Sequence, residues 1–152
     1  MMPSKRNALA TGRAIIEARM PLSGVKSASI SVHSQRLLDY FRNPRNAGEL
    51  APPALKADVE NPACGDMLRL TARFDNDRVV EARFQVRGCT ASIAAASALT
   101  EWMTGKSREE LKTLTAAMIE EAVGGLEPAS KHAAVLCVDG VKALLGLPRG
   151  GE

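Results

Sequence analysis

Aromatic residues are scarce in this chain, where Phe, Trp and Tyr together make up 3% of 152 residues. The hydrophobic content of 45% must therefore come mainly from Ala, Leu, Val and Ile, which we expect to build the core. Few aromatic rings leave little for bases to stack on, and a net charge of +3 arises from basic residues interleaved with acids. These features argue against nucleic-acid binding.

Long apolar runs and paired cysteines are also missing. No stretch approaches the roughly 20 apolar residues of a transmembrane helix, so we expect no membrane interaction. The three cysteines are widely spaced and odd in number, unlike the disulfide framework of a small secreted protein. They suit a reducing compartment, which favours a cytoplasmic location and metal or thiol chemistry.

Residues 1–30 differ from the rest of the chain in their charge. Glu17 is the only acid among them, against five basic residues. We interpret this segment as a disordered N-terminal extension. It could instead be a targeting peptide, which would place the protein in the mitochondrial matrix, or translation could start at Met20. Residues 31–146 then form a single domain.

Alternating side chains predict strands in the first half of this domain. Residues 55–60 are a short strand candidate. Residues 68–74 and 80–86 alternate apolar with polar side chains on either side of a turn at 75–77, as in a hairpin with one apolar face. In the second of these strands the inward positions are expected to be Val80, Ala82, Phe84 and Val86.

Helical patterns surround these strands. A first helix spans residues 37–41 and ends at Asn43-Pro44, and a second follows Cys89 and is capped by Gly105. A capping box of Ser107 and Glu110 predicts a helix carrying Leu111 and Leu114, and further helices are expected over residues 115–123 and from about residue 130. Strands followed by helices predict an α+β fold, an antiparallel three-stranded sheet with helices packed on one face.

Two glycine-marked turns carry the chemistry. Residues 61–66 read NPACGD and residues 87–92 read RGCTAS. Pro62 and Gly65 favour a tight turn that presents Cys64 outward, with Asp66 two residues further on. Cys89 precedes an Ala-rich helix, whose positive N-terminal end favours the thiolate that binds metal or attacks a persulfide. Two such thiols beside a carboxylate predict a site for metal or sulfur.

At these residues the chain resembles the U-type iron–sulfur scaffold family, which comprises IscU, SufU and the N-terminal domain of NifU. The resemblance covers roughly residues 31–145. It rests on three blocks in family order, which are residues 37–48 (LLDYFRNPRNAG), the NPACGD turn, and Gly88-Cys89 through residues 100–107 (TEWMTGKS). It implies the SufE/NifU-like sandwich fold.

The resemblance also implies a function and a set of partners. Family members are not enzymes; they hold a transient [2Fe–2S] cluster, receive sulfur from a cysteine desulfurase and pass the cluster to apo-proteins. Carried over to this chain, the metal ligands are Cys64, Asp66, Cys89 and His132. In the family the carboxylate affects how readily the cluster is lost.

The last helix departs from the family pattern. Aligned without a gap, His132 falls on the family histidine, while Ala133 falls on the third cysteine, at what we expect to be the solvent-facing start of the helix. Cys137 lies four residues further, about 6 Å deeper along a helix, so we expect it to be a small core residue and only a possible alternative thiol. The missing thiolate puts sulfur delivery in question.

Alternatives therefore stay open. Two sulfurs, an imidazole and a carboxylate also complete a tetrahedral Zn²⁺ site, which would suit a zinc-bound sulfur acceptor with sulfurtransferase activity or a non-assembling regulatory relative. Residues 126–130 keep only Leu126 and Pro128 of the family's Leu-Pro-Pro-Val-Lys segment, so recognition by an Hsp70-type chaperone is left undecided. The interval from Cys89 to His132 is close to that of the IscU branch and has no room for the SufU insertion.

Overall fold

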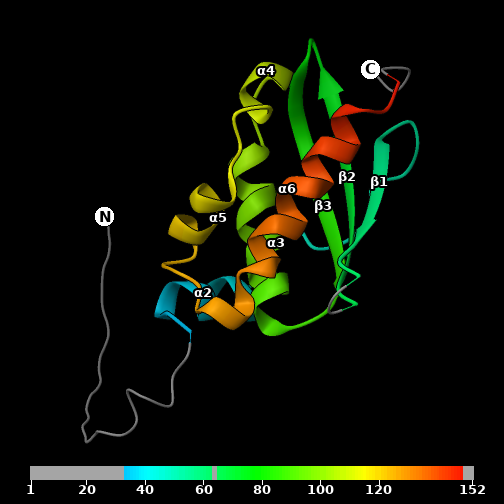
Figure 1. The fold of residues 1–152 in the computed structure, drawn as a ribbon. Helices are drawn as coiled ribbons and strands as arrows, with labels where there is room; N and C mark the ends of the chain where they lie inside the picture. Colours follow the sequence, from blue (N-terminus) through cyan, green and yellow to red (C-terminus); the bar gives the residue numbers. More distant parts are fainter. Residues whose placement is uncertain (1–32, 63–64, 149–152) are drawn as a thin grey trace, which may run out of the picture. The chain divides into compact units, whose positions relative to one another are not determined.

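The computed structural model describes residues 33–62 and 65–148, whose arrangement is shown in Figure 1. Helix α2 precedes three strands, and the remaining helices follow. The bounds are α2 Gln35–Arg42, β1 Leu55–Glu60, β2 Met67–Asp75, β3 Arg78–Arg87, α3 Thr90–Met103, α4 Arg108–Leu111, α5 Ala116–Ala122, the 3₁₀ helix η1 Pro128–Ser130, and α6 His132–Leu145. The predicted α+β class is confirmed. Within these ranges no helix is long and apolar enough to cross a membrane.

Short polar motifs start and stop the helices. The Ser34 side chain accepts a hydrogen bond from the Leu37 amide at the start of α2, and Asn43 ends this helix. The predicted capping box of Ser107 and Glu110 is present at the start of α4. This helix is shorter than expected, because it ends at Leu111, and Leu114 is buried in the turn that follows.

The sheet has the strand order β1-β2-β3 and both pairings are antiparallel. Asn76 and Asp77 join β2 to β3 with φ values of 53° and 66°, the left-handed pair that a tight hairpin turn needs. The β2–β3 pairing shifts by one residue between Arg73 and Phe74. As a result Val79 is 1% exposed and Val80 is 44% exposed, so the prediction that Val80 points inward was wrong.

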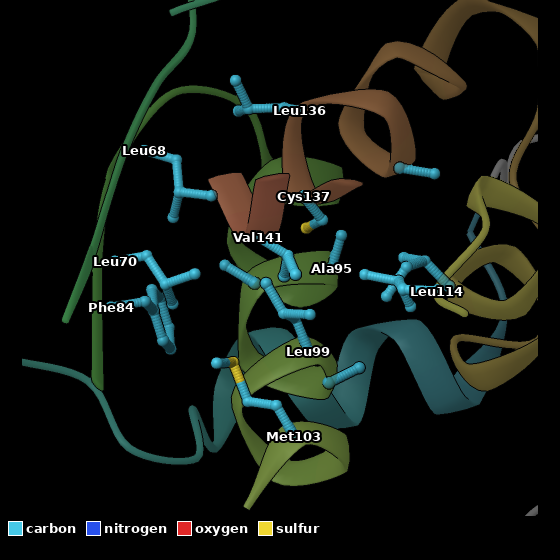
Figure 2. Packing of buried hydrophobic residues seen from close by; sticks show 14 of the residues in the cluster. Leu68, Leu70, Phe84, Ala95, Leu99, Met103, Leu114, Leu136, Cys137 and Val141 are labelled. Atoms are coloured by element: carbon cyan, nitrogen blue, oxygen red, sulfur yellow. The ribbon is translucent and has the colours of Figure 1, made fainter. Parts of the chain in front are cut away.

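Helices α3 and α6 lie side by side over one face of the sheet, with α6 against β1 and β2 and α3 against β3 (Figure 1). Figure 2 shows Leu70 and Phe84 of the sheet facing Leu99 of α3 and Val141 of α6. Close approach depends on small residues. A Cβ at Gly140 would lie 2.8 Å from Leu68 Cδ2, so α6 can pack this tightly on β2 only without a side chain there.

The loop between α2 and β1 runs along the outer edge of β3 and then lies against the face of the sheet opposite the helices. The Gly48 amide donates to the Phe84 carbonyl at 2.7 Å, and the Phe84 amide donates to the Asn46 carbonyl at 3.0 Å. The Leu50 amide donates to Thr71 Oγ1 at 3.1 Å. Thr71, a polar position of the predicted alternation, is therefore fully buried, because a distant segment lies over it.

Candidate metal centre

The ends of four elements meet at one place, where β3 ends and β2, α3 and α6 begin. Met67 pairs with Arg87 across β2 and β3, so the residues just outside this pair, Asp66 and Gly88, leave the sheet at the same end. Cys89 follows as the N-cap of α3. His132 is the first residue of α6, and its ring reaches the Asp66 carboxylate. Antiparallel pairing and helix packing thus gather residues that are far apart in the sequence.

The donor atoms of Asp66, Cys89 and His132 lie within 4.8 Å of one another. Cys89 Sγ is 3.5 Å from Asp66 Oδ2 and 3.7 Å from His132 Nε2, and Nε2 is 3.2 Å from Oδ2. One tetrahedral ion with metal–ligand bonds of about 2.0–2.3 Å would hold such donors about 3.3–3.6 Å apart. The three atoms therefore match one face of a tetrahedral metal site.

The hydrogen-bonding pattern distinguishes this group from a nucleophile and its general base. In a catalytic triad the histidine contacts the nucleophile with one ring nitrogen and the carboxylate with the other. Here Cys89 and Asp66 both approach Nε2 of His132. A sulfur and a carboxylate oxygen that both approach the same ring nitrogen have the arrangement expected of ligands around a shared cation.

Asp66 is the buried member of the group, with 7% of its surface exposed. Burial raises the pKa of its carboxyl, but hydrogen bonds from the Ser92 hydroxyl, the Cys89 thiol and amide, and His132 outweigh burial and leave that pKa below its usual value. The Ser92 hydroxyl donates to Oδ2 at 2.5 Å. The carboxylate is thus charged at neutral pH, as a metal ligand must be.

Gly88 provides the space for this carboxylate. A Cβ at position 88 would lie 2.6 Å from Asp66 Cγ. The backbone of Gly88 is outside the left-handed region, so the absence of a side chain matters here for room and not for conformation. Any larger residue would push Asp66 away from Cys89.

Cys89 is exposed, and its sulfur lies at the N-terminal end of α3, as the sequence predicts. Cys64 lies outside the described residues. Near it in the sequence, the Asn61 amide donates to the Asp66 carbonyl at 2.8 Å and the Gly65 amide donates to the Asn61 carbonyl at 2.7 Å. Asn61 and Gly65, which lie on either side of position 64, are therefore hydrogen-bonded to each other, and Asn61 is also hydrogen-bonded to Asp66.

Ala133 and Cys137, the two positions of α6 considered for a third thiol, both lie away from solvent. Cys137 lies in the core beside Val141 (Figure 2), and burial raises the pKa of its thiol to about 12. Ala133 is fully buried, so the expectation that it marks a solvent-facing helix start was wrong. The reason is that η1 and the first turn of α6 pack inward, with Ser130, Ala133 and Ala134 all buried.

Ser92 is the residue of this site that sequence reasoning missed. It is 2% exposed, lies three residues after Cys89 on α3, and its hydroxyl is 3.4 Å from Cys89 Sγ. The signal was available, because a side chain three positions from a candidate ligand on a helix faces the same side. Such a buried hydroxyl also needs a partner.

Comparisons with known proteins agree with this geometry. Residues 32–146 match the family model described as the NifU-like N terminal domain. The iron–sulfur cluster assembly scaffold protein IscU of Azotobacter vinelandii is 37% identical over 115 residues, which cover 73% of this chain and 89% of the relative. IscU of Haemophilus influenzae is 35% identical over 117 residues, covering 74% and 92%.

A solved structure supports the fold. The crystal structure of a nitrogen-fixing NifU-like protein (N-terminal) from Brucella abortus aligns with a TM-score of 0.60 at 19% identity, over 75% of this chain and 92% of that chain. With the family model spanning most of the sequence, the chain belongs to the NifU-like N-terminal domain family. The resemblance inferred from the three sequence blocks is confirmed.

Proposed function

We propose that this member of the NifU-like N-terminal domain family is an iron–sulfur cluster assembly scaffold, which holds a transient [2Fe–2S] cluster and passes it to apo-proteins. The observation that carries the proposal is the convergence of Asp66, Cys89 and His132 at one end of the sheet. Relatives at 35% and 37% identity are named as scaffolds of this kind.

The donor set suits iron. Thiolate and imidazole both ligate iron in [2Fe–2S] centres, and a carboxylate oxygen is a weaker partner that favours release. We assign Asp66, Cys89 and His132 as ligands and Cys64, two residues before Asp66, as the fourth. The spacing of the three described donors fits a single ion, so we infer that one iron is held there first and that sulfide and the second iron follow.

Sulfur reaches the site through an exposed cysteine in this proposal. The Cys89 thiolate attacks the outer sulfur of a persulfide on a cysteine desulfurase, so that a new S–S bond forms at Cys89 while the desulfurase cysteine leaves as a thiolate. An external reductant supplies two electrons to convert each transferred sulfur to sulfide. Cys137 takes no part, because it is buried and its pKa is raised to about 12.

The protein acts as a carrier and not as an enzyme in this role. Its partners are a cysteine desulfurase and apo iron–sulfur proteins. We place this assembly in the cytoplasm, a reducing compartment in which an exposed thiol such as Cys89 stays free. Fractionation of the native host would test the location, and enrichment in mitochondria would favour a targeting role for residues 1–30.

Anaerobic reconstitution tests the function. The full chain is stripped of zinc with a chelator, since zinc fits the same donors, and is then given ferrous iron, cysteine, a reductant and a cysteine desulfurase. We expect visible absorption and Mössbauer spectra of a [2Fe–2S] cluster, and transfer of that cluster to apo-ferredoxin. Cys89→Ser and His132→Ala should lose the cluster, whereas Cys137→Ser should keep it. A wild type that forms no cluster, or equal loss in all three variants, would overturn the proposal.

A further inference from the structure

The Ser92 hydroxyl is buried beside the metal-ligand candidates, in the first turn of α3. Apart from Thr90 at the start of this helix, its neighbours there are Ala91, Ile93, Ala94, Ala95 and Ala96, none of which offers a polar side chain. A hydroxyl in such surroundings loses its hydrogen bonds to water and must be compensated inside the protein. It is compensated by Asp66 Oδ2, at 2.5 Å.

All the side-chain contacts of the Asp66 carboxylate within the site converge on the same oxygen. Oδ2 is the atom that meets Ser92, and it is also the atom that meets Cys89 at 3.5 Å and His132 at 3.2 Å. An ionised carboxylate oxygen offers about two lone-pair directions. When Ser92 occupies one of them, the other is left for a cation that lies among Oδ2, Sγ and Nε2.

We propose that Ser92 is a positioning residue of the iron site, which fixes the rotation of the Asp66 carboxylate so that Oδ2 presents its free lone pair to the metal. This inference rests on the proposed function, since it concerns the same site. Ser92 does not bind the metal; it acts through Asp66.

Ser92 makes the shortest of the side-chain contacts of Oδ2, at 2.5 Å. The carboxylate also lies against Gly88, where a Cβ would lie 2.6 Å from Cγ and 2.8 Å from Oδ2, and it accepts a hydrogen bond from the Cys89 amide. The Cys89 thiol and the His132 ring are themselves metal ligands in the proposed site, so Ser92 is the described side chain that keeps its hydrogen bond to Oδ2 when metal binds. Without this bond the carboxylate rotates more freely, because the terminal torsion of an Asp side chain is broad.

Cobalt binding to the apo-protein provides a test that does not depend on cluster assembly. The full chain, stripped of metal under anaerobic conditions, is titrated with Co²⁺ against a competing chelator, and the visible spectrum reports thiolate ligation and coordination geometry. Loss of a group that orients a metal ligand typically weakens affinity about 10–100-fold. We expect that loss for Ser92→Ala, together with weaker or shifted d–d bands. Ser92→Thr, which keeps the hydroxyl, should restore most of the affinity.

Two further variants show whether the effect passes through Asp66. Ser97→Ala removes another buried hydroxyl of α3, which accepts a hydrogen bond from the Arg45 amide at 2.7 Å and lies away from the site. This variant should leave Co²⁺ affinity unchanged. In an Asp66→Ala background, Ser92→Ala should cause no additional loss, because its effect requires the carboxylate.

The possible outcomes distinguish a failure of the role of Ser92 from a failure of the proposed function. Equal Co²⁺ affinity of wild type and Ser92→Ala, or an undiminished effect of Ser92→Ala in the Asp66→Ala background, overturns the role of Ser92 while leaving the metal site intact. Equal losses in Ser92→Ala and Ser97→Ala overturn it too, because they indicate a general effect on the fold. A wild type that binds no Co²⁺ overturns the proposed function itself.

Discussion

Replacing Gly88 with Ala should disable the site without unfolding the protein. The added Cβ would lie 2.6 Å from Asp66 Cγ, 2.8 Å from Oδ2 and 3.0 Å from Oδ1. Carbon atoms in ordinary contact are about 3.5–4.0 Å apart, so the carboxylate must move by about 1 Å. Since the Gly88 backbone is not left-handed, Ala brings no conformational strain of its own, and the collision with Asp66 is the whole perturbation.

The displaced group is the end of a side chain, so rotation of the Asp66 carboxylate relieves most of the collision. We expect the free energy of unfolding to fall by about 1 kcal/mol, the lower end of the cost of overpacking. The same rotation breaks the 2.5 Å hydrogen bond from Ser92 and turns Oδ2 away from Cys89 and His132. Metal affinity should therefore fall about 10–100-fold, as it does when the orientation of a ligand is lost.

Two other glycines provide controls for this variant. Gly140→Ala places a Cβ 2.8 Å from Leu68 Cδ2 in the core, so it should lower stability while leaving metal affinity unchanged. Gly146→Ala meets its nearest atoms at 3.5 and 3.6 Å, ordinary contacts, and should change neither. Urea unfolding of the metal-free protein measures stability, and Co²⁺ competition measures affinity. The reasoning fails if Gly88→Ala binds Co²⁺ like wild type, or if it weakens binding as much when Asp66 is already Ala.

Two further predictions concern individual groups of the chain. Iodoacetamide at pH 8 should modify Cys89 in the folded protein and leave Cys137 unmodified until the protein is unfolded, because burial raises the pKa of Cys137 to about 12. Peptide mapping measures the two labelling rates, and comparable rates would contradict this prediction. The pKa of Asp66 is lowered in the folded state, so its charged form stabilises the fold above about pH 4, the ordinary value of an unfolded Asp, and this contribution is lost as the pH falls through the folded value. Asp66→Asn should then flatten the fall in urea midpoint between about pH 5 and pH 3, and parallel curves for variant and wild type would refute the assignment.

Most of the fold could be predicted because its signals are local. Strand β1 matches the predicted residues 55–60, and the capping box at Ser107 and the turn at Asn76-Asp77 are where the sequence places them. The errors come from interactions between distant segments. Val79 and not Val80 points into the core because of a register shift, which depends on the partner strand. Thr71 is buried by a loop some 20 residues away in the sequence.

The candidate site could be predicted only in part. The turn containing Asp66 and the helix start after Cys89 have local signatures, and His132 came from alignment to the family helix. The structure brings these three together; that they bind metal stays a prediction. Ser92 was missed because its importance depends on the rotation of another side chain. Ala133 was misplaced because a position at the start of a helix says nothing about what packs over it.

The three donors are buried to different degrees, so the site has a buried side and an exposed side. Asp66 is buried and held by hydrogen bonds from α3, His132 is half-buried at the start of α6, and Cys89 is exposed. In the proposed function, an incoming sulfur or an acceptor protein would therefore meet Cys89 first, while the carboxylate would hold the metal from the protein side. Exchange of the thiolate ligand on the open side needs no movement of the core, and the carboxylate can release the metal while it keeps its hydrogen bond to Ser92. On these grounds we expect an acceptor protein to approach the metal at Cys89, and Asp66, the weaker ligand, to ease its release.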